Sequence, residues 1–104
     1  MRTAITHPRR QPRRVFLTAH TAYYVRGTTC VAVRERGGAW LDHEAIGRRL
    51  EGSLRVDTRG GVRPVVGHSP TIGEHLCFSG DIVTSPLRRI VFDDAGSRAA
   101  RRAA

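Results

Sequence analysis

Short apolar stretches alternate with glycine-containing turns along most of the chain. Paired glycines, or glycine next to Thr or Asp, mark several of these turns, at positions 27–28, 37–38, 60–61 and 80–81. The stretches between the turns are rich in Val, Ile, Thr and aromatic residues, which favour β-strands. We therefore predict strands at residues 15–18, 22–26, 29–36, 53–57, 62–66, 74–79 and 82–92, the last of them broken near Pro86.

Alternation within two of these strands predicts one buried and one exposed side. Val31 and Val33 lie two residues apart and should share one face, opposite the residues between and around them. Leu76 and Phe78 repeat this spacing in a later strand. Strands of this type have one side against a core and the other against water.

One segment has a helical pattern instead. Residues 42–50 begin with Asp42, a favourable helix N-cap, and Gly52 follows, as is common just beyond a helix end. Ile46 and Leu50 lie four residues apart and would share one face of a helix. The sequence thus predicts an all-β, mostly antiparallel fold: a small barrel or roll of six to seven strands with one short helix and disordered basic ends.

Composition limits the chain to one domain. It has 104 residues, of which 39% are hydrophobic and 26% charged, as in ordinary globular proteins. This length excludes a two-domain enzyme with a cleft between its lobes. No apolar run approaches the roughly 18 residues of a membrane span. Cys30 and Cys77 are too few for the disulfide framework of a small secreted domain, so we expect a cytoplasmic protein with no membrane partner.

The positive charge is concentrated at the two ends. The formal net charge is +9, and all 18 basic residues are arginine. Residues 1–14 carry five arginines and residues 98–104 carry three, with no acidic residue in either segment. We predict three regions: a flexible basic arm at 1–14, a single β-barrel-like domain at 15–96 and a basic C-terminal tail at 97–104.

Two motifs resemble a set of small, uncharacterised bacterial β-barrel proteins. Residues 18–25 (TAHTAYYV) resemble the Thr-x-Asn-Ser-x-Tyr-x-Val hairpin that opens those proteins, with His20-Thr21 in place of Asn-Ser. Residues 83–90 (VTSPLRRI) resemble their closing Thr-Ser-Pro-Val-x-x-Ile strand. This resemblance implies an all-β fold and no particular activity.

A third motif resembles part of another family. Residues 9–17 (RRQPRRVFL) resemble the Arg-x-x-x-Arg element that precedes the first strand of PilZ domains, which are six-stranded barrels that bind cyclic di-GMP. The resemblance implies that two arginines clamp phosphate and guanine edges by paired hydrogen bonds. The family's second element, Asp/Asn-x-Ser-x-x-Gly, has no counterpart, because residues 57–60 (DTRG) lack a serine in register.

Catalytic and metal chemistry are weakly indicated, and we predict neither an enzyme nor a cofactor. Residues 67–71 (GHSPT) begin like a nucleophile elbow but have threonine in place of the second glycine. His75 and Cys77 could share a metal ion with Cys30 or His20, but structural zinc sites usually contain two closely spaced ligand pairs. We therefore expect no metal site.

We predict instead a non-catalytic binding module that acts through an anionic or protein partner. Tyr23 and Tyr24 are adjacent in a predicted strand, so one should pack inward and the other, near Arg26, could stack on a base. Two alternatives stay open: a PilZ-like cyclic dinucleotide sensor, and non-specific nucleic-acid binding through the arginine-rich tails. The candidate binding residues are Arg9, Arg10, Arg13, Arg14, Arg26 and Tyr24.

Overall fold

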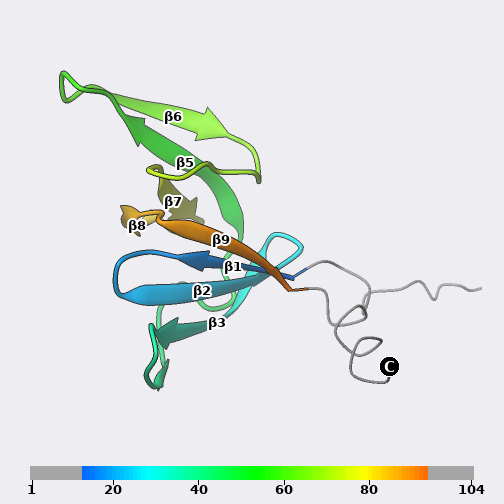
Figure 1. Cartoon of the computed structure of the whole chain (residues 1–104). Helices are drawn as coiled ribbons and strands as arrows, with labels where there is room; N and C mark the ends of the chain where they lie inside the picture. Colours follow the sequence, from blue (N-terminus) through cyan, green and yellow to red (C-terminus); the bar gives the residue numbers. More distant parts are fainter. Residues whose placement is uncertain (1–12, 94–104) are drawn as a thin grey trace, which may run out of the picture.

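Nine β-strands form two antiparallel sheets in residues 13–93, the part of the chain that the computed structural model describes (Figure 1). The five-stranded sheet has the order β4-β3-β2-β1-β9, and the four-stranded sheet has the order β6-β5-β7-β8. The strands are β1 (Arg13–Leu17), β2 (Thr21–Arg26), β3 (Thr29–Glu35), β4 (Trp40–Leu41), β5 (Leu50–Val56), β6 (Val62–Val66), β7 (His75–Phe78), β8 (Ile82–Pro86) and β9 (Arg89–Asp93). The predicted all-β, antiparallel class is confirmed.

The predicted barrel is wrong, because neither sheet closes on itself or on the other. Within the described residues each sheet is open, with β4 and β9 at the edges of one and β6 and β8 at the edges of the other. The chain does break near Pro86 as predicted, and the break moves it from one sheet to the other: β8 pairs with β7, whereas β9 pairs with β1. The predicted region at 82–92 thus contains two strands that belong to different sheets.

The hydrophobic core lies between the two sheets. Its largest fully buried side chains include Phe16 from the five-stranded sheet and Leu50, Leu76 and Phe78 from the four-stranded sheet. The rings of Tyr23 and Phe78 meet across the core with their centroids 5.8 Å apart. The predicted alternation at Leu76 and Phe78 is therefore confirmed, and Tyr23 is the inward member of its pair.

The predicted helix at residues 42–50 is also wrong. The segment forms turns, and Leu50 begins β5. Gly47 has a φ of +89°, a left-handed conformation that ends any right-handed helix. Backbone groups of the segment bond to the neighbouring hairpin, since the N–H of Gly47 donates to the Cys30 carbonyl and the N–H of Leu50 to that of Thr28. Residues 13–93 contain no helix that is long and apolar enough to cross a membrane.

A β-bulge reverses the predicted sidedness of β3. Tyr24 pairs with Ala32 but Val25 pairs with Cys30, so Val31 is an extra residue without a partner on β2. Cys30 is consequently fully buried, and Val31 is 41% exposed. The prediction that Val31 and Val33 share a face is wrong for this reason, although Val33 itself does lie in the core.

Candidate functional site

Strand register defines the face of the five-stranded sheet that points away from the core. Residues directly opposite each other in an antiparallel sheet share a face, so the register arranges this face in rows. One row crosses all five strands, the second contains Tyr24 at its centre, and the third lies at the end of the sheet. The rows are Arg89, Leu17, Ala22, Arg34 and Trp40; Val91, Val15, Tyr24 and Ala32; and Asp93, Arg13, Arg26 and Thr29. We call this surface the arginine face.

Two aromatic rings form the centre of one half of the arginine face. The centroids of Tyr24 and Trp40 lie 5.2 Å apart, with their planes tilted by 48°. The two residues belong to strands that are separated by β3, where Ala32 is the partner of Tyr24 and has too small a side chain to fill the space between the rings. Trp40 is 60% exposed. The pair therefore presents an open aromatic surface to solvent.

Arg34 adds a cation to this aromatic pair. Its guanidinium carbon lies 5.1 Å from the centroid of the Trp40 ring, within the range of a cation–π contact. Its Nε–H donates a 2.7 Å hydrogen bond to the Gly38 carbonyl in the β3–β4 turn. This bond holds the guanidinium against the indole and leaves its two terminal amino groups without a hydrogen-bond acceptor among residues 13–93. They can bind an anionic oxygen.

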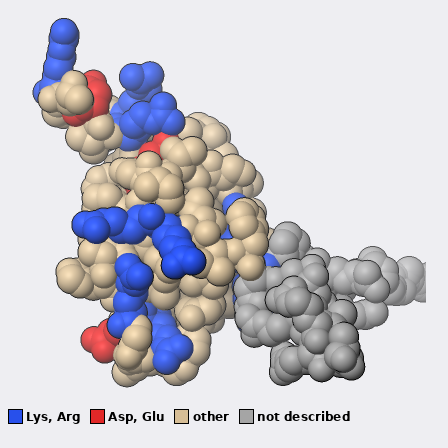
Figure 2. Space-filling model, in the orientation of Figure 1, with Lys and Arg blue, Asp and Glu red and all other residues tan. Residues whose placement is uncertain are grey.

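The arginine face is the positively charged side of the described fold. Its three rows contain four arginines and one acidic residue, Asp93. Arg36 and Arg88 lie just beyond β3 and just before β9, so they extend the charge at one end of the sheet. Figure 2 shows arginine side chains (blue) spread over the region of β1–β3 and β9, with acidic atoms (red) at its lower border. Such a surface favours anions.

The structure places Arg13 and Arg14, two of the predicted binding residues, on opposite faces of the five-stranded sheet. Both belong to β1, so the strand begins two residues before the predicted boundary of the arm. Arg13 lies on the arginine face, whereas Arg14 points to the core side, with its guanidinium carbon 5.1 Å from the centroid of the Phe16 ring. Arg14 donates to the carbonyls of Gly27 and His68, and burial lowers its pKa. Arg14 therefore links loops to β1 and is not available as a surface ligand.

Two of the other four predicted binding residues lie within the described part of the chain. Tyr24 and Arg26 lie on the arginine face as expected, whereas Arg9 and Arg10 lie outside the described residues. Sequence reasoning missed Trp40, Arg34 and Arg89. Only Trp40, two residues after the Gly37-Gly38 turn, had a local sequence signal, whereas Arg89 joins the rows through pairing of β9 with β1, which are distant in the chain.

A buried carboxylate occupies the inner side of the four-stranded sheet. Glu74 has only 3% of its side chain exposed, and its Oε1 accepts hydrogen bonds from the Ser53 hydroxyl (2.8 Å) and the Thr71 N–H (2.9 Å). Its Oε2 accepts two bonds from the Arg55 guanidinium, at 3.0 and 2.6 Å. Burial alone would raise the pKa of Glu74, but the bonds from Thr71, Ser53 and Arg55 lower it to about 2. This group is therefore ionised at neutral pH and ties β5 to the segment before β7.

The residues considered as metal ligands do not come together. Cys30 is fully buried in the core, whereas Cys77 lies on the opposite side of the four-stranded sheet, facing outward. The Nδ1 of His75 lies 2.8 Å from the Thr84 carbonyl. Within residues 13–93 no three His, Cys, Asp or Glu side chains gather closely enough to hold a metal ion.

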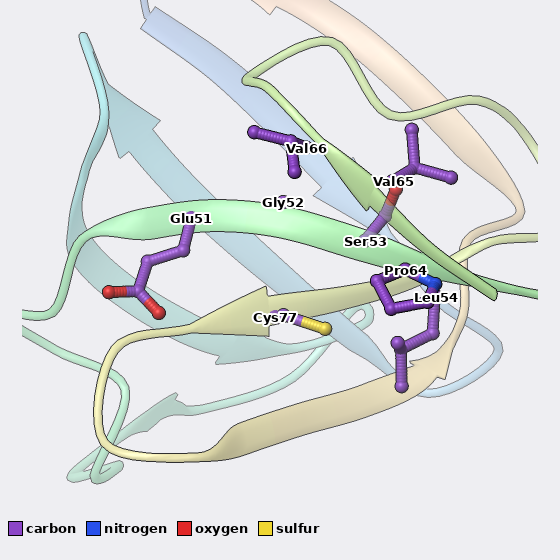
Figure 3. A pocket seen from close by; sticks show the side chains of 8 residues that line it. All are labelled: Glu51, Gly52, Ser53, Leu54, Pro64, Val65, Val66 and Cys77. Carbon is purple, nitrogen blue, oxygen red and sulfur yellow. The ribbon is translucent and has the colours of Figure 1, made fainter. Parts of the chain in front are cut away.

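The outer face of the four-stranded sheet has a different chemistry. It presents exposed aliphatic side chains, among them Val66 (92% exposed) on β6. A shallow hollow of about 150 Å³ lies over Gly52, with Leu54, Pro64 and Cys77 gathered at one side of it (Figure 3). A Cβ atom on Gly52 would lie 2.4 Å from the Val65 carbonyl oxygen, so only glycine fits there. This side of the molecule has no row of arginines like that of the arginine face.

Comparison with known proteins leaves the arginine face without an assigned role. The resemblances to small bacterial β proteins and to PilZ domains stay predictions. No protein-family model, no curated protein and no solved structure matches the chain.

Proposed function

We propose that this protein is a non-catalytic binding module that holds an anionic polymer on its arginine face. The observation that carries this proposal is the distribution of charge over the outer face of the five-stranded sheet: four arginines and two aromatic rings in three rows, with one acidic residue at a corner. A polymer with repeated anionic groups could contact several of these arginines at once.

The spacing of the arginines favours an extended ligand over a small one. Arg89 and Arg34 stand in the same row but on β9 and β3, three strand spacings apart, which is about 14 Å at the usual separation of neighbouring strands. Arg26 lies two rows, or four residue pairs, further along the sheet. A ligand that reaches all three must span most of the face. The same arginines would add to the attraction of the basic segments 1–12 and 94–104.

Heparin titration in increasing salt tests the proposal. Each arginine that neutralises an anionic group releases counterions, so affinity falls with salt in proportion to the number of contacts. We expect the double variant Arg34→Gln/Arg89→Gln to bind more weakly than the natural protein and to lose roughly one to two units of the log–log salt slope. The matched control is Arg59→Gln/Arg63→Gln, which removes the same charge from the exposed β5–β6 hairpin.

The control variant distinguishes binding through the arginine face from binding that depends only on the net charge of the protein. If the protein acts through its arginine face, the hairpin variant keeps nearly the full slope. Equal losses in both double variants would contradict the proposal, because they would show that only net charge matters. A slope that depends on residues 1–12 and not on Arg34 and Arg89 would also contradict it and would favour binding through the tails.

A further inference from the structure

We infer that Trp40 and Tyr24 stack on an unpaired nucleic-acid base, so that the polymer on the arginine face is a single-stranded nucleic acid. This inference rests on the proposed function and names its ligand. It depends on three features found at one place: an exposed indole, a second ring 5.2 Å from it and a guanidinium on its ring face.

The indole combines exposure with a fixed orientation. It is 60% exposed although it contacts both Tyr24 and Arg34. Arg34 is in turn held by its 2.7 Å bond to the Gly38 carbonyl. The ring is therefore positioned before a ligand arrives, and stacking on it immobilises few additional side chains. The exposed part of the indole is therefore open to a ligand.

The ring and the cation recognise two parts of the same ligand. Every base has a flat π-face that can stack on an aromatic side chain, whatever its sequence. The terminal amino groups of Arg34 can meanwhile donate to the phosphate that follows the stacked base. Arg26, next along β2 on the same side as Tyr24, lies where the following phosphates would run. The carboxylates of an acidic protein would pair with the arginines but would make no use of the two aromatic rings.

A duplex fits the arginine face less well than a single strand. Bases within a duplex are already stacked on one another and offer only their edges in the grooves. Residues 13–93 contain no helix that could enter a major groove. Unpaired bases can instead turn toward a protein and stack on exposed rings, as on other sheet surfaces that bind single strands. We therefore expect the affinity to depend weakly on the base sequence of the nucleic acid and strongly on whether it is single-stranded or double-stranded.

Fluorescence gives a direct readout, because Trp40 is the only tryptophan in the chain. The test titrates the full-length protein with a twelve-nucleotide oligothymidylate, with a duplex of the same length and with heparin. We expect the oligothymidylate to quench the emission of Trp40 and heparin, which has no bases, to bind without quenching. Trp40→Leu should weaken oligothymidylate binding by about 5- to 100-fold and heparin binding by a much smaller factor, and Trp40→Phe should restore most of the oligothymidylate loss.

The matched control is Phe92→Leu, which removes an aromatic side chain that is 73% exposed and whose strand position places it off the arginine face. We expect this variant to bind the oligothymidylate like the natural protein. Binding of both polymers without quenching, and with equal affinity in Trp40→Leu, would overturn the stacking inference while leaving the proposed function intact. Failure of heparin and oligothymidylate alike to bind would overturn both. Tighter binding of the duplex than of the single strand would also overturn the inference.

Discussion

Replacement of Glu74 by glutamine should destabilise the fold strongly although the new side chain has the same size. The carboxylate is 3% exposed and accepts four hydrogen bonds, from Ser53, Thr71 and Arg55. A glutamine keeps one oxygen acceptor, but its amide nitrogen is a donor and cannot receive the two bonds from the Arg55 guanidinium. The variant thus removes a buried charge together with half of its hydrogen-bond acceptors.

The pKa of Glu74 gives the magnitude. The bonds lower it from 4.5 to about 2, and each pKa unit corresponds to about 1.4 kcal/mol, so the network contributes about 3 kcal/mol at neutral pH. The Arg55 side chain is 52% exposed, and water screens its contribution, which reduces the expected loss to about 2 to 3 kcal/mol. For a domain of this size that corresponds to a fall of about 10 to 20 °C in Tm.

The sign of the pH dependence follows from the lowered pKa. The unfolded chain binds a proton at Glu74 near pH 4.5, whereas the folded protein resists protonation until about pH 2. The stabilisation is therefore complete above about pH 5 and is lost as the pH falls toward 2. The natural protein and Glu74→Gln should differ most at neutral pH and converge in acid.

Urea unfolding followed by circular dichroism at pH 7, 5 and 3 measures this difference. Glu44→Gln is the control, because Glu44 is exposed and the change should alter stability by less than about 0.5 kcal/mol. The reasoning is refuted if Glu74→Gln is as stable as the control at pH 7. It is also refuted if the difference between Glu74→Gln and the natural protein is the same at pH 3 as at pH 7.

Three further predictions concern other parts of the fold. Gly52→Ala should lower the free energy of unfolding by about 1 to 3 kcal/mol, because its Cβ would lie 2.4 Å from a backbone oxygen; an unchanged urea midpoint would contradict this. Arg14→Met should lower stability by about 1 to 3 kcal/mol but leave the salt slope of heparin binding unchanged, since Arg14 faces the core side; a reduced slope would count against that placement. Burial raises the pKa of Cys30 to about 11, so Ellman's reagent at pH 8 should label this thiol only after unfolding. Rapid labelling of Cys30 in the folded protein would contradict its burial in the core.

Local features of the sequence predict most strands but not how they are joined. Glycine turns and β-branched stretches place seven strand regions within a few residues of their observed positions. The bulge at Val31 and the turns at residues 42–50 depend on contacts with other strands, such as the bond from Gly47 to the Cys30 carbonyl. A barrel or roll was predicted from the number of short strands and the need to protect their edges, whereas the strand pairing observed in residues 13–93 leaves both sheets open.

The candidate site was predictable only in part for the same reason. Tyr24 and Arg26 could be identified because adjacent tyrosines in a strand must face opposite ways. Trp40 joins them through the β3–β4 hairpin, whose second strand was not predicted, and Arg89 joins them through pairing of β9 with β1, which are distant in the chain. The concentration of charge at the chain ends favoured the arm as the binding site, although Arg34 and Arg89 of the interior share one row of the arginine face.

Chemical-shift mapping by NMR tests most directly whether the arginine face is the acting surface. The measurement titrates ¹⁵N-labelled full-length protein with the twelve-nucleotide oligothymidylate at low salt. We predict that the largest shifts occur at the backbone amides of Tyr24, Arg26 and Arg34 and at the indole N–H of Trp40. Shifts confined to the four-stranded sheet, for example at Val66, or to residues outside 13–93, would contradict the account.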